Sequence, residues 1–210
     1  MIPSILAIIP AKLDSRRLPG KNLLPVGGVP MYQRTQLLAE AAGCFERIIV
    51  SSDHELPLID GVAMHVRPVS LCGDVPSIDV AKSILNEWFI EAGNWLPEWT
   101  CLLQPTSPVL RDSTLAYAAR LCADDVDAVI AGHNPIYVEP ISNLRKPCGA
   151  FYFVRSYILA SLNLPFAMAL QKWDSENRVS WVPVPDDESV DVDTHNDWVK
   201  ADLIAQAREE

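Results

Sequence analysis

The sequence predicts an α/β fold with three layers, in which a mostly parallel β-sheet lies between two layers of helices. Apolar runs too short for helices alternate along the chain with longer stretches whose apolar residues recur at helical spacing. Strands that alternate with helices in this way form parallel sheets covered on both faces. The length of 210 residues suits one domain, so we expect residues 1–210 to form a single unit.

The expected strands are short apolar runs bounded by turn residues. The run from Ile5 to Pro10 comes first, is ended by proline, and is expected to be fully buried. The run from Arg47 to Ser51 is a second buried strand, followed by Ser52 and Asp53 as a turn. The expected strands lie near residues 4–9, 47–51, 62–66, 100–104, 127–131, 149–154 and 179–184.

The expected helices carry recognisable residues at their ends. Pro30 stands at the start of one helix and Gly43 follows its end, which is the usual asymmetry. Thr194, with Asp197 three residues later, predicts a capping box at the start of the last helix. The expected helices lie near residues 30–42, 77–93, 112–123 and 195–208.

Composition limits the class of partner. The net charge of −10 and the pI near 4.8 argue against a nucleic-acid surface. No apolar stretch approaches the length of a membrane span, and Lys12 follows the first apolar run, whereas a signal peptide carries its charge before it. The five cysteines are odd in number and show no metal-binding spacing. We therefore expect a cytoplasmic protein with reduced thiols and no nucleic-acid or membrane partner.

A cation-rich loop follows the first strand. It contains Lys12, Arg16, Arg17 and Lys21, four of the 17 basic residues of an acidic chain. Loops at the carboxyl ends of parallel strands are where such sheets bind ligands, so this local positive charge predicts a phosphorylated ligand. The patterns GxxxxGK[ST] and GxGxxG are absent, which argues against a P-loop and against a simple dinucleotide site.

Two carboxylates stand one residue apart near the end of the chain, at Asp191 and Asp193. In an extended strand, residues i and i+2 point to the same side, so these side chains lie together and repel unless a cation or a donor separates them. Hard oxygen ligands of this kind suit Mg²⁺ beside nucleotide phosphates. The alternative is that both aspartates only favour the start of the last helix through its dipole.

The loop after the first strand resembles the signature of the sugar-acid cytidylyltransferases, the acylneuraminate and Kdo group. The stretch I-I-P-A-K-L-D-S-R-R-L-P-G-K-N is similar to their I-P-A-R-x-x-S-K/T-x-L/I-P-x-K-N. Lys12 stands where the family usually has arginine, which keeps the charge but loses the planar fork. Further similar segments follow in the same order at residues 45–53, 67–80, 102–108 and 189–194.

The resemblance implies a nucleotide-diphospho-sugar transferase, Rossmann-like fold. It also implies a CMP-sugar acid synthetase that transfers CMP from CTP to a 2-keto sugar acid and releases pyrophosphate. Thr106 stands where Kdo-type members have a metal-binding aspartate, which favours the acylneuraminate branch and a sialic-acid-like acceptor. Two rivals stay open: a nucleotidyltransferase with a non-sialic acceptor, and a catalytically silent nucleotide-binding homologue.

The resemblance also implies roles for individual residues. The implied catalytic residues are Lys12, Arg16, Lys21 and Asp193. The implied metal ligands, for Mg²⁺ or Mn²⁺, are Asp191 and Asp193. The implied substrate-binding residues are Gln104 and Thr106. The implied nucleotide-binding residues are Ala11, Lys12, Ser15, Arg16, Arg17, Lys21, Asn22, Arg67 and Ser77.

Two of these residues have a second interpretation, and one segment departs from the family. Ser77 either caps its helix or lines the nucleoside pocket, and Arg67 either reaches the triphosphate or ties down its own loop. The family's long acceptor and dimerisation insertion is shortened near 131–148 and lacks R-x-Q. The resemblance implies a possible homodimer, although its usual contact segment is shortened in this chain. The nearest cations, Arg145 and Lys146, either meet a substrate carboxylate or belong to a solvated loop.

Overall fold

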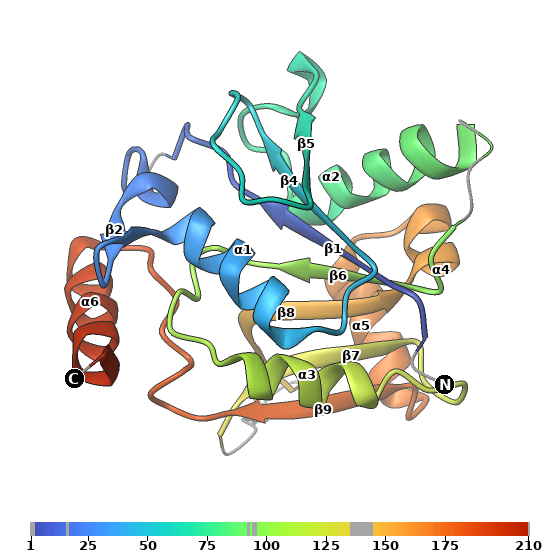
Figure 1. Ribbon diagram of the computed structural model, residues 1–210. Helices are drawn as coiled ribbons and strands as arrows, with labels where there is room; N and C mark the ends of the chain where they lie inside the picture. Colours follow the sequence, from blue (N-terminus) through green and yellow to red (C-terminus); the bar gives the residue numbers. More distant parts are fainter. Residues whose placement is uncertain (1–2, 16, 92, 94–95, 135–144, 210) are drawn as a thin grey trace.

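The computed structural model describes residues 3–15, 17–91, 93, 96–134 and 145–209. The strands are β1 (Ile5–Pro10), β2 (Pro25–Val26), β3 (Val29–Pro30), β4 (Arg47–Ser52), β5 (Val62–Val66), β6 (Trp99–Leu103), β7 (Ala128–His133), β8 (Pro147–Arg155) and β9 (Val179–Val184). Seven of them form one sheet in the order β5-β4-β1-β6-β8-β7-β9 (Figure 1). β2 and β3 form a separate two-stranded ribbon.

The sheet is mostly parallel, as the sequence predicts. β1 lies inside it and pairs in parallel with β4 on one side and with β6 on the other. β5 continues the parallel set beyond β4, and β9 pairs in parallel with β7. β8 runs antiparallel between β6 and β7. The carboxyl ends of β1, β4, β5 and β6 therefore meet at one edge, beside the middle of β8.

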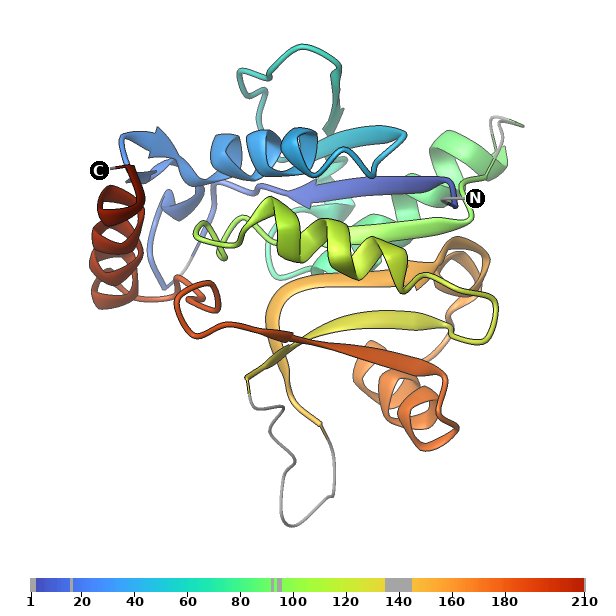
Figure 2. The same cartoon turned by 60° about the horizontal axis from the view of Figure 1, so that its bottom comes forward.

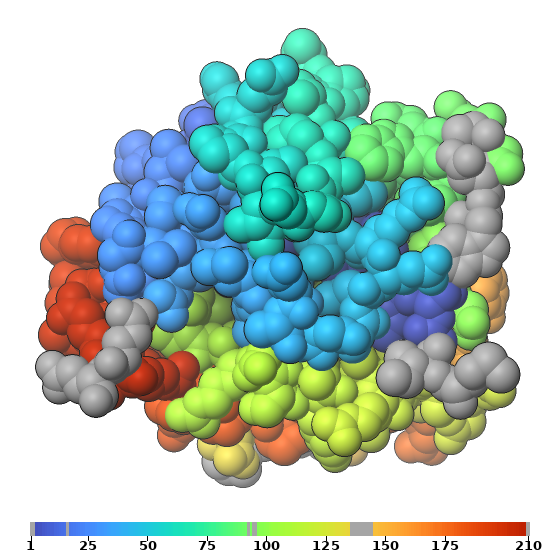
Figure 3. Space-filling view, viewed as in Figure 1, coloured from blue at the N-terminus to red at the C-terminus, as the bar shows by residue number. Residues whose placement is uncertain are grey.

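Helices cover both faces of this sheet (Figures 1 and 2). The helices are α1 (Met31–Ala42), α2 (Ser77–Ile84), α3 (Asp112–Arg120), α4 (Ser156–Ser161), α5 (Phe166–Ser175) and α6 (His195–Glu209). Along β1, Ile5 and Ile9 pack in the cluster that includes α1 and α3, whereas Leu6 and Ile8 pack in the cluster that includes α2, α4 and α5. Alternating side chains of one buried strand thus separate two hydrophobic cores. Figure 3 shows α1 and α3 side by side, closing the first of these faces.

The last helix packs beside the β2-β3 ribbon. The Trp198 indole donates to the carbonyl of Pro25 at 2.8 Å, and the amide of Gly27 donates to Asp202 at 2.8 Å. The capping box at its start is confirmed, because the amide of Asp197 donates to the Thr194 hydroxyl at 3.3 Å and the amide of Thr194 donates back to the Asp197 carboxylate at 2.8 Å.

Several elements differ from expectation. The helix predicted over 77–93 is α-helical to Ile84 and continues as a wider π-helical segment, η3 (Leu85–Glu91). The helices α4 and α5 were not predicted. The loop expected over 133–147 lies largely outside the described residues, which omit 135–144. All five cysteines are free thiols, and burial raises the pKa of Cys44 to about 11. Within the described ranges, no helix is both long and apolar enough to cross a membrane.

Candidate active site

A cleft of about 350 Å³ lies at the edge where the parallel strands end. Its walls come from the loop after β1, the segment between β5 and α2, the loop after β6, the middle of β8 and the segment before α6. The predicted site residues that line it are Lys12, Arg17, Lys21, Asn22, Arg67, Ser77, Gln104, Thr106, Asp191 and Asp193. Residues from five separate parts of the chain therefore meet at one place.

Two predicted residues that the structure describes, Ala11 and Ser15, do not line this cleft. Ala11 is fully buried, and its amide donates to the carbonyl of Ser51 at 2.8 Å, so it joins the loop to β4. Ser15 is also buried. Arg16 lies outside the described residues.

The cation-rich loop is held by a carboxylate that the sequence analysis treated only as a turn residue. Asp53, just after β4, accepts the amides of Leu13 at 2.8 Å and of Asp14 at 3.4 Å. Burial opposes ionisation of Asp53, but these donated hydrogen bonds prevail and lower its pKa. The side-chain amide of Asn22 also supports the loop, because its Nδ2 donates to the carbonyl of Lys12 at 2.7 Å. Asp53 follows β4 as the loop follows β1, so the sequence already placed this carboxylate at the same edge of the sheet as the loop. That position could have identified Asp53 as the residue that holds the loop.

The cations of the loop face the aspartate pair. Lys21 Nζ lies 3.0 Å from Asp193 Oδ1 and 3.1 Å from the carbonyl of Val192. The Arg17 guanidinium forms an ion pair with the other oxygen of Asp193. Lys12 Nζ donates to the carbonyl of Gly73 at 2.7 Å. In this state Asp193 neutralises two of the cations that the sequence assigned to phosphate.

The aspartate pair faces the cleft, although its segment is extended rather than a paired strand. Val190 and Val192 are buried against α6, so the alternating Asp191 and Asp193 turn toward the cleft. The amide of Val192 donates to the carbonyl of Thr106 at 2.8 Å, which joins this segment to the loop after β6. The predicted side-by-side placement therefore holds without the predicted strand.

The environment of Asp191 suits a cation. Its partial burial raises the pKa of the carboxyl, a hydrogen bond from the Thr106 hydroxyl opposes this, and the neighbouring Asp193 raises the pKa further. Gly149 lies beside this carboxylate with a φ of 93°, which favours glycine, and a Cβ there would be in van der Waals contact with Asp191 Oδ2 at 3.5 Å. Across the described part of the chain, no group of three or more His, Cys, Asp or Glu side chains is arranged to hold a metal ion. The aspartate pair fits a cation that takes its other ligands from a bound phosphate and water.

The two open interpretations of Ser77 and Arg67 are resolved differently. Pro76 occupies the N-cap position of α2 and Ser77 makes no capping hydrogen bond, so the capping interpretation is wrong and Ser77 lines the cleft. Arg67 ties down its own segment through Ser51, and its contact with a triphosphate stays a prediction. It donates to Ser51 from Nε to Oγ at 3.1 Å and from Nη2 to the carbonyl at 3.0 Å, while it also lines the cleft.

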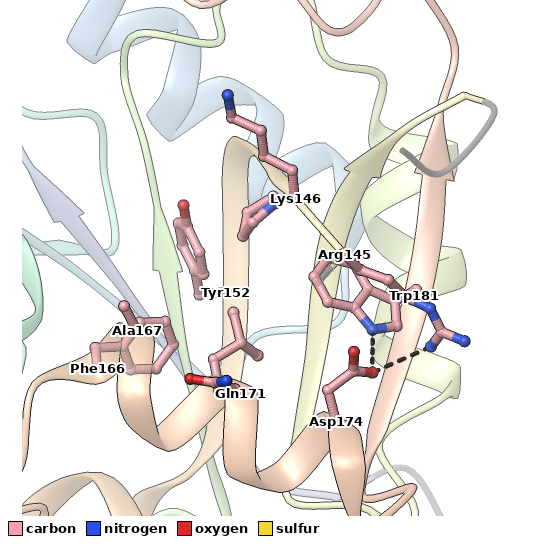
Figure 4. Close-up of a pocket in the computed structure, with 10 residues that line it drawn as sticks. Arg145, Lys146, Tyr152, Phe166, Ala167, Gln171, Asp174 and Trp181 are labelled. Atoms are coloured by element: carbon pink, nitrogen blue, oxygen red, sulfur yellow. Dashed lines mark hydrogen bonds and ion pairs between the residues drawn. The ribbon is translucent and has the colours of Figure 1, made fainter. Parts of the chain in front are cut away.

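A second pocket of about 300 Å³ adjoins the cleft and shares Tyr152 of β8 with it (Figure 4). Phe166 and Leu170 of α5 and Trp181 of β9 form much of its apolar lining. Burial is the main cause that raises the pKa of Tyr152 to about 12, so its hydroxyl stays protonated. The sequence analysis placed Tyr152 and Trp181 in strands but gave them no role, and it placed no helix at 166–175, so the pocket was missed.

The polar groups of this pocket are arranged around one carboxylate. Asp174 Oδ1 accepts from Trp181 Nε1 at 2.8 Å and from Arg145 Nη1 at 3.1 Å, as the dashed lines in Figure 4 mark. Arg145 is thus already paired within the protein. In the same view, the Lys146 amine and the Tyr152 hydroxyl point in a common direction, away from Asp174.

The sequence of the chain matches known proteins. A family profile described as Cytidylyltransferase matches residues 6–73. A CMP-N,N'-diacetyllegionaminic acid synthase of Legionella pneumophila is 28% identical over 239 aligned positions, which cover 98% of each chain. The chain is a homologue of the sugar-acid cytidylyltransferases.

Two further proteins compare with this cytidylyltransferase homologue in sequence or in fold. A pseudaminic acid cytidylyltransferase of Campylobacter jejuni is 32% identical over 118 residues, which cover 54% of this chain and 50% of the relative. The solved structure of a CMP:2-keto-3-deoxy-manno-octonic acid synthetase complexed with CTP superimposes with a TM-score of 0.71 at 18% identity, covering 99% of this chain and 100% of that one. At that identity the likeness concerns the fold, and it confirms the predicted fold class.

Proposed function

We propose that this protein transfers CMP from CTP to a 2-keto sugar acid of the sialic-acid-like type and releases pyrophosphate. The observation that carries the proposal is the meeting of Lys12, Arg17 and Lys21 with an aspartate pair in one cleft at the carboxyl edge of the sheet. Such an edge is the usual ligand position in open α/β sheets. The relatives named above as synthases and cytidylyltransferases of sugar acids support the same reaction.

The cations act on the charge of the nucleotide. In the proposed reaction the anomeric hydroxyl of the acceptor attacks the α-phosphorus, an O–P bond forms, and the bond to the pyrophosphate breaks. Negative charge grows on the departing pyrophosphate, and Lys12, Arg17 and Lys21 stand in the cleft to neutralise it. Arg16, in the same loop, is proposed to assist them. The chain thus contributes mainly positioning and electrostatic stabilisation.

Asp191 and Asp193 would hold the divalent cation, Mg²⁺ or Mn²⁺. When bound there, the cation polarises the α-phosphate of the nucleotide. Asp193 is occupied by Lys21 and Arg17 in the present arrangement. We propose that the incoming triphosphate draws both cations toward itself and so frees this carboxylate.

The pocket beside the cleft is the proposed seat of the acceptor. It shares Tyr152 with the cleft, so an acid bound in the pocket lies next to the nucleotide. Its apolar lining suits the acylamino and methyl groups of a modified sugar acid. Lys146 is proposed to meet the acceptor carboxylate, since Arg145 is already paired with Asp174. Gln104 and Thr106 line the cleft and are proposed to bind the substrate.

The remaining proposals concern assembly and compartment. We propose a cytoplasmic enzyme, and the five free thiols support this. A homodimer is proposed from the resemblance. The shortened segment of this chain near 131–148, which corresponds to the family's usual contact segment, falls mostly within 135–144, outside the described residues.

Release of pyrophosphate tests the proposed reaction. The purified protein is incubated with CTP, Mg²⁺ and a panel of acids that includes acylated nonulosonic acids, Kdo and simple 2-keto acids. We expect pyrophosphate with an acylated nonulosonic acid and with CTP in preference to ATP, GTP or UTP. Release with a different acid would identify the acceptor as non-sialic, which the shortened acceptor segment favours as the second candidate. Binding of CTP without release for any acid would indicate a silent homologue.

A further inference from the structure

Three buried polar side chains form a connected group behind the cleft wall. The hydroxyl of Ser51 lies 3.0 Å from His65 Nδ1 and 3.1 Å from Arg67 Nε. These side chains belong to residues that are 0%, 4% and 6% exposed, in that order. Of the three, Arg67 reaches the cleft lining. The position of a cleft residue therefore depends on two residues that a ligand does not meet.

The strand register places these residues together. Ser51 in β4 and His65 in β5 are direct partners in the parallel ladder, so their side chains lie on the same face of the sheet. Arg67 follows β5 immediately, and its amide donates to the carbonyl of Ser52 at 2.8 Å. The carbonyl of Ser51 also accepts the amide of Ala11, the residue that opens the cation-rich loop. Ser51 is thus the junction between the loop and Arg67.

Hydrogen-bond chemistry fixes the proton positions in this group. A guanidinium only donates, so the Ser51 oxygen must accept from Arg67 Nε. The Ser51 oxygen has a second lone pair, so the tautomer of His65 follows from Glu87, whose carboxylate lies 3.8 Å from Nε2 and favours the proton there. His65 Nδ1 then accepts the Ser51 hydroxyl proton. The imidazole is therefore neutral and carries its proton on Nε2. A protonated Nδ1 would donate to the Ser51 oxygen and could no longer accept the hydroxyl proton, which would turn away.

The surroundings favour the neutral imidazole. Burial lowers the pKa of His65, the carboxylate of Glu87 opposes this, and the Arg67 charge lowers the pKa further. Glu87 Oε2, from η3, lies 3.8 Å from His65 Nε2, the nitrogen that carries the proton. The Trp88 ring meets the imidazole edge to face at 5.8 Å. Asp53 is the further charged group that acts on Arg67.

We propose that His65 is a positioning residue for nucleotide binding, which acts by accepting the Ser51 hydroxyl so that Ser51 holds the Arg67 guanidinium at the cleft wall. The inference rests on the proposed binding of CTP and deepens it. Arg67 donates from Nε and Nη2 to Ser51, and its other N–H groups can donate to an anionic ligand. His65 itself touches no substrate, so it is not a catalytic residue.

The test measures the affinity for CTP with Mg²⁺ by titration calorimetry. His65→Leu and Ser51→Ala each break the relay, by which we mean the hydrogen bonds that run from His65 through Ser51 to Arg67. We expect each variant to weaken CTP binding about tenfold at pH 7.5, the usual effect of losing one buried hydrogen-bond partner. His65→Asn keeps an acceptor near the position of Nδ1, and we expect it to stay within about threefold of wild type. Thr35→Val is the matched control, since it removes a buried hydroxyl bonded to the carbonyl of Met31 in α1. It should leave CTP affinity unchanged.

Two readouts separate positioning from a merely structural role. The double variant Ser51→Ala/His65→Leu should bind CTP no more weakly than either single variant, because both break one relay. Lowering the pH to about 5 should weaken CTP binding more in wild type than in His65→Asn, since only wild type protonates Nδ1. Protonation of the nucleotide phosphate is common to both proteins and cancels in this comparison.

The outcomes distinguish this inference from the proposed function. Wild type that binds CTP, with His65→Leu and Ser51→Ala binding equally well, would overturn the inference alone. Additive losses in the double variant, or equal pH dependence in wild type and His65→Asn, would overturn it as well. If His65→Leu does not fold, Ser51→Ala and His65→Asn carry the same comparison. Wild type that does not bind CTP would overturn the proposed function and the inference with it.

Discussion

Replacing Asp193 by asparagine should strengthen CTP binding without metal and remove the gain in CTP affinity that a divalent metal gives. This carboxylate is paired with Lys21 at 3.0 Å and with Arg17, so metal-free CTP must compete with it for both cations. The attraction across 3.0 Å is about 1.4 kcal/mol even with the dielectric constant of water, because two unit charges interact by about 332/(80 × 3.0) kcal/mol. That energy corresponds to about a tenfold change in affinity.

We therefore expect Asp193→Asn to bind CTP about tenfold more tightly than wild type when no divalent metal is present. The same variant should lose the gain in CTP affinity that Mg²⁺ or Mn²⁺ gives to wild type, because one of two proposed metal ligands is gone. Titration calorimetry with CTP, in EDTA and in excess metal, measures both effects. Pyrophosphate release should fall at least about a hundredfold.

Asp186→Asn is the matched control for this experiment. Asp186 lies in the same segment and is exposed, and it does not line the cleft. Its removal changes the net charge by the same amount, so it should leave CTP binding and metal dependence unchanged. The reasoning is refuted if Asp193→Asn binds metal-free CTP no more tightly than Asp186→Asn, or if metal still strengthens its CTP binding as in wild type.

Four further outcomes follow from the structure. Gly149→Ala should lower the free energy of unfolding by about 1–3 kcal/mol in urea titrations, because its φ of 93° disfavours a side chain, and it should weaken metal-dependent CTP binding through Asp191. Phe166→Ala should raise the KM for the acceptor while the Kd for CTP stays constant, and equal changes in both would exclude a separate acceptor pocket. Asp53→Ala should cost about 1–3 kcal/mol of stability, since it leaves loop amides without their acceptor. Stability that depends on His65 should be complete above its ordinary pKa of about 6.5 and decline as the pH falls further, because the folded state lowers that pKa; urea unfolding of wild type against His65→Asn between about pH 5 and 8 measures the difference.

The sequence predicted best where local pattern and tertiary packing agree. β1 and β9 lie within one residue of their predicted bounds, because an uninterrupted apolar run or a clear alternation marks them. Asp191 and Asp193 both line the cleft although their segment pairs with no strand, since the burial of Val190 and Val192 decides the direction of the side chains. Alternation is a property of extended backbone and needs no paired neighbour.

The missed features depend on contacts that no local pattern contains. Ser77 is a good capping residue by type, but Pro76 takes the N-cap position, with a φ of −57° that a proline ring already favours. α4 has six residues and α5 has ten, too few turns for a strong helical period. Asp53 acts on a loop 40 residues away in sequence, and only the adjacency of β1 and β4 brings the two together.

The antiparallel strand β8 separates the cleft from the adjoining pocket. Because β8 runs against its neighbours, the middle of a doubly paired strand, rather than a loop, stands between the cleft and the adjoining pocket, and Tyr152 belongs to both. The distance between the proposed nucleotide site and the proposed acceptor site is then set by a rigid ladder. If the adjoining pocket seats the acceptor as proposed, substitutions in α5 and β9 change which acceptor fits while the nucleotide site keeps its geometry. An architecture of this kind allows acceptor preference to diversify among homologues without rebuilding the donor site.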